Sequence, residues 1–202
     1  APMGTAAAPP PPPPPDAEAR VREADRRALE ATATALREQI HRAANLVKLE
    51  DKITIELLDE GLRIQLLETS QGMFFDVGSA RVKAATQEIL SLIGREVGKL
   101  PNDVALEGHT DSRPYTGQPS YSNWELSTDR ANAARRILET HGLRGGQVAS
   151  VVGYADRHLA NRADPLDSAN RRISIIVRFQ KAKGLAKPSA LQPPLAASAP
   201  RS

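Results

Sequence analysis

An acid and a base on either side of one loop are the residues of this chain best suited to chemistry. Asp111 follows a short apolar segment, and Arg130 lies about two turns inside the helix expected after the loop. A carboxylate can accept hydrogen bonds from an ammonium group, and the planar guanidinium of arginine can hold a carboxylate with two parallel bonds. The pair therefore predicts a clamp for a small zwitterion. The spacing leaves a purely structural interpretation open, in which Asp111 caps a turn and Arg130 pairs with Glu125 or Asp129.

No group of residues in the sequence predicts catalysis. The chain has 4 histidines, and none stands at the spacing of a zinc motif such as HExxH. It has no cysteine, which excludes disulfides and thiolate metal ligands. Ser122 and Ser127 lack an adjacent base that would activate a hydroxyl as a nucleophile. We therefore expect a protein without catalytic residues, metal or cofactor.

Length and composition predict one domain with tails. The 202 residues carry a net charge of +3 and only 3% aromatic residues, which argues against nucleic-acid binding. No stretch reaches the roughly 18 apolar residues that span a bilayer. The chain begins with Ala1 and shows no signal peptide. We expect a processed or truncated fragment, so that any membrane anchor lies outside this sequence.

The front of the chain predicts two kinds of linker. Residues 1–15 end in seven consecutive prolines, which favour an extended polyproline II rod. Residues 16–50 predict a linker helix that runs to about Val47. Its apolar residues recur at spacings of three and four, and they are Leu29, Ala33, Leu36, Ile40, Ala43 and Val47. Such a stripe needs a partner, which is either a second copy of the helix or the domain that follows.

Residues 51–180 show the pattern of one α+β domain. Alternating apolar residues predict a hairpin over 53–66 and later strands at 104–107, 150–154 and 172–179. Helices are expected over 79–100 and 122–141, the second opened by a capping box of Ser122 and Glu125. We expect these helices on one face of a small mixed β-sheet. Residues 181–202, rich in Ala, Pro, Ser and Lys, predict a flexible C-terminal tail.

Several motifs between residues 61 and 179 resemble the OmpA-like peptidoglycan-binding domain. They are Phe75–Ala80, Gly108–Asp111, Asn123–Ala131 and Asn170–Ile173. The run from Tyr121 to Ser127, with a long loop after Asp111, is similar to the MotB branch of that family, whose members belong to the stator of the bacterial flagellar motor. The resemblance covers the whole predicted domain apart from its first strand.

The resemblance implies a ligand and a set of residues that hold it. In the family, the residues that match Asp111 and Arg130 grip the diaminopimelate of the peptidoglycan stem peptide. Accompanying pocket positions match Thr110, Asn123, Leu126 and Arg171. The longer loop makes these four assignments depend on the shape of the pocket. The residues themselves predict only a zwitterion, and the resemblance supplies its identity.

The resemblance also implies a setting for the domain. It implies a periplasmic, non-enzymatic wall anchor, a homodimer, and an inner-membrane protein whose single transmembrane helix, outside this chain, contacts MotA. We predict that the front helix switches between a compact and an extended form, since unfolding residues 16–47 lengthens them from about 48 Å to roughly 105 Å. The alternative is an anchor of another envelope protein, such as a lipoprotein or a secretion-system component. A wall hydrolase is a third class, and no residues support it.

Overall fold

The computed structural model describes residues 15–47, 49–76 and 78–180. The elements in chain order are α1 (Pro15–Val47), β1 (Ile53–Leu58), β2 (Gly61–Leu67), α2 (Ala84–Val97), β3 (Val104–His109), α3 (Asn123–Thr140), β4 (Val148–Gly153) and β5 (Arg172–Arg178), with 3-10 turns at Glu50–Lys52 and Ser168–Asn170. The linker predicted for residues 1–15, apart from Pro15, lies outside the described residues, and so does the predicted tail.

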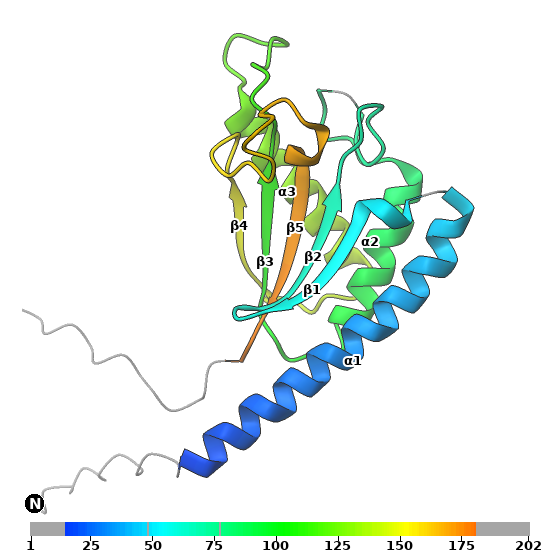
Figure 1. The fold of residues 1–202 in the computed structure, drawn as a ribbon, viewed down its shortest axis with the longest axis vertical. Coiled ribbons are helices and arrows are strands. Elements are labelled where there is room, and N and C mark those ends of the chain that lie inside the picture. The colour runs from blue at the N-terminus through cyan, green and yellow to red at the C-terminus, as the bar shows by residue number, and fades with distance from the viewer. Residues whose placement is uncertain (1–14, 48, 77, 181–202) are drawn as a thin grey trace, which may run out of the picture.

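The strands form one mixed sheet in the order β1-β2-β5-β3-β4 (Figure 1). β3 and β4 are parallel, and the other neighbouring pairs are antiparallel. The last strand, β5, lies in the centre and joins the β1–β2 hairpin to the β3–β4 pair. α2 and α3 cover one face of this sheet. The prediction of an α+β domain with helices on one face is therefore confirmed.

The core between sheet and helices is almost entirely aliphatic. Alternate residues of β2 and β5 point into it, as the two-residue period requires. Buried members include Leu62, Ile64, Leu66, Ile173, Ile175 and Val177 from the strands, and Ile89, Ile93, Val97 and Leu138 from the helices. The sheet can pack closely on α2 and α3 because these side chains are branched and compact.

The apolar stripe of α1 packs on its own domain. Leu29 and Leu36 are 0% exposed, and they join Ala33 and Ile40 in the same core cluster. α1 contacts α2, β1 and β2, and in Figure 1 it extends well below the sheet. The sequence left two possible partners for the stripe, a second copy of the helix or the domain that follows it. In the structure the partner is the domain that follows. The C-terminal part of the stripe is buried less fully than expected, since Ala43 is only half-buried. The side chain of Val47 lies outside what the structure describes.

The helix expected over residues 79–100 is shorter in the structure. It begins at Ala84 because Val82 pairs with Phe75 in an antiparallel bridge, which keeps residues 79–83 out of a helix. Lys83 is the extended N-cap residue, and its ammonium group donates to the carbonyl of Gly72. The helix ends at Val97 rather than at about Leu100. The prediction was wrong at the start of the helix because the apolar spacing does not reveal the bridge between Phe75 and Val82.

Candidate functional site

The helix that carries Arg130 begins at a well-formed cap. The Ser122 hydroxyl accepts from the backbone N–H of Trp124 at 3.2 Å, and the Glu125 carboxylate accepts from the backbone N–H of Ser122 at 2.8 Å. This reciprocal arrangement is the capping box that the sequence predicts. It fixes where α3 starts, and therefore which residues of α3 face the end of β3.

A glycine in β3 lets α3 lie directly on the strand. A Cβ atom at Gly108 would lie 1.9 Å from the backbone oxygen of Ser127, so no other residue fits without moving the helix. Asp111 follows two residues after the end of β3. The close contact between strand and helix brings the carboxylate of Asp111 and the guanidinium of Arg130 to the same pocket.

That pocket has a volume of about 440 Å³. The loop after β2, the long loop after β3, the first turns of α3 and the residue before β5 surround it. It is lined by all six residues expected from the sequence, namely Thr110, Asp111, Asn123, Leu126, Arg130 and Arg171. The structure thus brings the whole predicted set together around one pocket.

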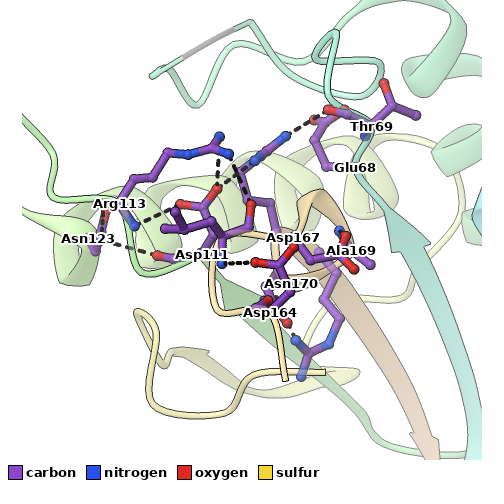
Figure 2. Close-up of polar contacts among 12 residues, drawn as sticks. Glu68, Thr69, Asp111, Arg113, Asn123, Asp164, Asp167, Ala169 and Asn170 are labelled. Carbon is purple, nitrogen blue, oxygen red and sulfur yellow. Dashed lines mark hydrogen bonds and ion pairs between the residues drawn. The ribbon is translucent and has the colours of Figure 1, made fainter. Parts of the chain in front are cut away.

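Asp111 is buried and already paired with two arginines. Its Oδ2 accepts from Nη1 of Arg171 at 2.5 Å and lies 3.4 Å from Nη1 of Arg113. Its Oδ1 accepts from the backbone N–H of Arg113 at 3.1 Å (Figure 2). The structural interpretation is therefore correct for Oδ1, which caps a turn. Since a carboxylate oxygen can accept two hydrogen bonds, Oδ1 keeps one acceptor position for a ligand.

Arg130 is buried without a carboxylate partner. Its side chain lies with the guanidinium carbon 5.0 Å from the centre of the Phe75 ring, and its Nε donates to the Ser79 carbonyl at 2.9 Å. Within the described residues it forms no ion pair, and its two Nη atoms have no acceptor. The expected alternative, pairing with Glu125 or Asp129, is therefore wrong.

Burial and a nearby negative charge act in opposite directions on the pKa of the Arg130 guanidinium. Burial lowers the pKa of Arg130, and the negative charge of Glu68 is the strongest influence that opposes the shift. An arginine nevertheless stays protonated at neutral pH. A buried cation whose two terminal nitrogens lack acceptors is well suited to bind a carboxylate with two parallel hydrogen bonds.

The accessory residues shape the pocket in different ways. Asn123 ties down the long loop by donating to the carbonyl of Arg113 at 2.8 Å. Leu126 is buried and supplies an apolar wall. The hydroxyl of Thr110 is buried and has no hydrogen-bond partner in the described residues. Arg171 bridges the site, since its Nη2 donates to the Thr69 carbonyl at 2.7 Å.

Several lining residues were not predicted as part of the site. Glu68, Phe75, Arg113 and Tyr115 all face the pocket. Phe75 stands within a motif that had been recognised, but nothing in the sequence placed its ring beneath an arginine. A partial signal for Glu68 was present, because it is a carboxylate that follows immediately after the alternating strand β2.

Two kinds of site are absent from residues 15–47, 49–76 and 78–180. No group of three or more His, Cys, Asp or Glu residues in these ranges could hold a metal ion. None of the helices described there is both long enough and apolar enough to cross a bilayer.

Residues 74–172 match the OmpA family, and this range includes all the lining residues of the pocket except Glu68, Ser70 and Gly72. Motility protein B of Escherichia coli (strain K12) is 43% identical over 136 residues, which are 67% of this chain and 44% of that protein. The truncated flagellar export/assembly protein LafU of the same strain is 32% identical over 143 residues, 71% of this chain and 67% of that protein. The periplasmic domain of Helicobacter pylori MotB shares the fold, with a TM-score of 0.55 and 21% identity over 63% of this chain and 89% of that chain. The chain spans less than half the length of Motility protein B.

Proposed function

Because this chain belongs to the OmpA family, we propose that it is a non-enzymatic module that binds peptidoglycan and anchors a larger protein to the cell wall. Its similarity to Motility protein B supports a narrower role, in which the anchored protein is a stator subunit of the flagellar motor. The periplasmic domain with the same fold supports a periplasmic location. The same proposal includes a transmembrane helix outside this chain, a contact of that helix with MotA, and a homodimer of the protein.

The observation that carries this proposal is a buried arginine, Arg130, whose two Nη atoms have no acceptor among the described residues and which shares one pocket with the carboxylate of Asp111. Arg130 offers two Nη donors to a carboxylate, and Oδ1 of Asp111 retains one acceptor position for an ammonium group. Diaminopimelate carries both groups on one carbon atom. Thr110 lines the same pocket, and its buried hydroxyl has no hydrogen-bond partner among the described residues.

The same geometry suits an anchor rather than an enzyme. The ligand-binding groups stand on the ends of β3 and α3, which are held by the core and by the capping box. A motor needs a stationary frame to generate torque, and a pocket on rigid elements transmits force without yielding. Among the described residues that line the pocket there is no histidine or cysteine, and Ser70 is the one serine.

Regulation of reach by α1 is the second part of the proposal. Asp25 of α1 is buried, accepts from Nδ2 of Asn102 at 2.9 Å and accepts from the backbone N–H of Gln180 at 2.7 Å. Gln39 donates to Glu96 of α2 at 2.9 Å. These separate polar contacts, together with the apolar stripe, hold α1 in one docked position. Undocking and unfolding α1 extends the distance between the membrane and the wall.

Sedimentation with purified diaminopimelate-type sacculi tests wall binding. The wild-type chain is expected to pellet with the sacculi, and Arg130→Ala is expected to remain in the supernatant. Arg136→Ala is the matched control, because Arg136 is an exposed arginine on the same helix. Equal pelleting of the wild-type chain and Arg130→Ala would place the binding site elsewhere. Thermal unfolding of each variant separates lost binding from lost folding.

A further inference from the structure

A carboxylate at the edge of the pocket has no role in the proposed contacts with the ligand. Glu68 follows the last residue of β2 and is 5% exposed. It lines the pocket together with Arg130 and Arg171. Among the described residues no cation forms an ion pair with it, so its charge must be stabilised in another way.

Backbone N–H groups supply that stabilisation. Oε1 of Glu68 accepts from the N–H of Thr69 at 3.2 Å, from that of Phe74 at 2.9 Å and from that of Met73. Oε2 accepts from the N–H of Phe75 at 3.1 Å. One side chain therefore holds both ends of the segment 69–75 and fixes how this loop closes over the pocket.

Each end of that segment supports one of the pocket arginines. The carbonyl of Thr69 accepts from Nη2 of Arg171 at 2.7 Å, and Figure 2 shows Thr69 beside Glu68. The ring of Phe75 lies under the guanidinium of Arg130, 5.0 Å from its carbon atom. The backbone reinforces the arrangement, since the N–H of Glu68 donates to the carbonyl of Arg171 at 2.8 Å.

We propose that Glu68 is a positioning residue of this pocket, which sets the places of Arg130 and Arg171 through the loop it holds. The inference rests on the proposed binding of a zwitterion. Glu68 does not contact the ligand in this arrangement. Its effect reaches the ligand through Arg130, and therefore falls mainly on the part of the ligand that Arg130 holds, the carboxylate.

The chemistry of the loop explains why a carboxylate is required at this position. The four N–H groups need an acceptor only, and an ionised carboxylate has two oxygen atoms that accept and none that donate. Glutamine of the same length replaces one oxygen with an NH₂ group, which faces a backbone donor. A buried donor left without an acceptor is costly, so the segment shifts to avoid it.

The test measures how Glu68→Gln changes discrimination between two ligands. One is the tripeptide L-Ala-D-Glu-diaminopimelate, and the other is the same peptide with the carboxylate that adjoins its free ammonium group converted to an amide. Calorimetry on the full chain gives both dissociation constants. Wild-type protein is expected to prefer the free carboxylate, and Glu68→Gln is expected to lose roughly tenfold in affinity for that peptide while changing little toward the amide. Glu88→Gln, an exposed change on α2, is the matched control.

The possible outcomes distinguish a positioning role of Glu68 from a general loss of order in the pocket. A variant that keeps the wild-type preference, or that loses affinity equally for both peptides, overturns the inference. Should Glu68→Gln fail to fold, Phe75→Leu tests the same link, because it removes the ring beneath Arg130 and leaves the bonds of Glu68 in place. The same loss of preference is then expected. Wild-type protein that binds neither peptide refutes the proposed function itself, and the inference with it.

Discussion

Replacing Asp25 tests whether α1 is held to the domain by a specific polar contact. The Asp25 carboxylate is 5% exposed and accepts from Asn102 at 2.9 Å and from the Gln180 backbone at 2.7 Å and side chain at 3.2 Å. A hydrogen bond to a charged group contributes about 1.5–3 kcal/mol, and such contributions on one carboxylate do not add fully. Asp25→Ala is therefore expected to lower the free energy of unfolding by about 2–4 kcal/mol.

Urea denaturation measures that loss, and the melting temperature is expected to fall by roughly 4–16 °C. Amide hydrogen exchange then shows which part of the structure loses stability, because undocking of α1 should speed exchange in α1 before it speeds exchange in the sheet. Glu23→Ala is the control on the same helix. Within the described part of the chain, the one ion pair of Glu23 is an exposed pair with Arg27 at 3.0 Å, so its loss should change stability by less than about 0.5 kcal/mol. If Asp25→Ala were as stable as Glu23→Ala, with unchanged exchange in α1, the proposed role of Asp25 in holding α1 to the domain would be refuted.

Three further predictions concern the core, a helix cap and pH. Leu36→Ala removes a fully buried side chain, so urea denaturation should show a loss of about 2–5 kcal/mol, and a loss under 1 kcal/mol would contradict the docking of α1. Ser122→Ala removes the α3 cap and should cost about 1 kcal/mol by the same assay, whereas an unchanged value would argue against the capping box. Burial lowers the pKa of His109, so the unfolded state binds more protons below about pH 6.5. Stability is therefore complete above that pH and falls on acidification. His109→Asn should flatten this dependence in unfolding curves taken between pH 5 and 7, and an equally steep curve would exclude His109 as its source.

Much of the fold could be predicted because its signals are local. The alternation in β2 and β5, the stripe of α1 and the capping box at Ser122 each depend on residues within a few positions of one another. The beginning of α2 was missed although the contact that sets it joins residues that are close along the chain. Its first expected turn is taken up by the bridge between Phe75 and Val82, which only a folded loop can form.

The residues of the candidate site fall into two groups, those that local patterns in the sequence predict and those whose place depends on the tertiary structure. Asp111 and Arg130 were found because one loop separates them and their side chains have complementary chemistry. Arg171 came from the resemblance alone, and Glu68 was not found. Arg171 stands 60 positions after Asp111 along the chain, and it reaches that carboxylate because β5 is inserted between β2 and β3.

By itself, the sequence determined the elements, the apolar faces that must be covered and an acid–base pair able to hold a zwitterion. Only the tertiary structure decided that the stripe of α1 is covered by its own domain, that Asp111 pairs with Arg171, and that the two Nη atoms of Arg130 have no acceptor among the described residues. The physical reason is that burial and charge pairing depend on distances in space. Strand order sets those distances, and no spacing along the chain records it.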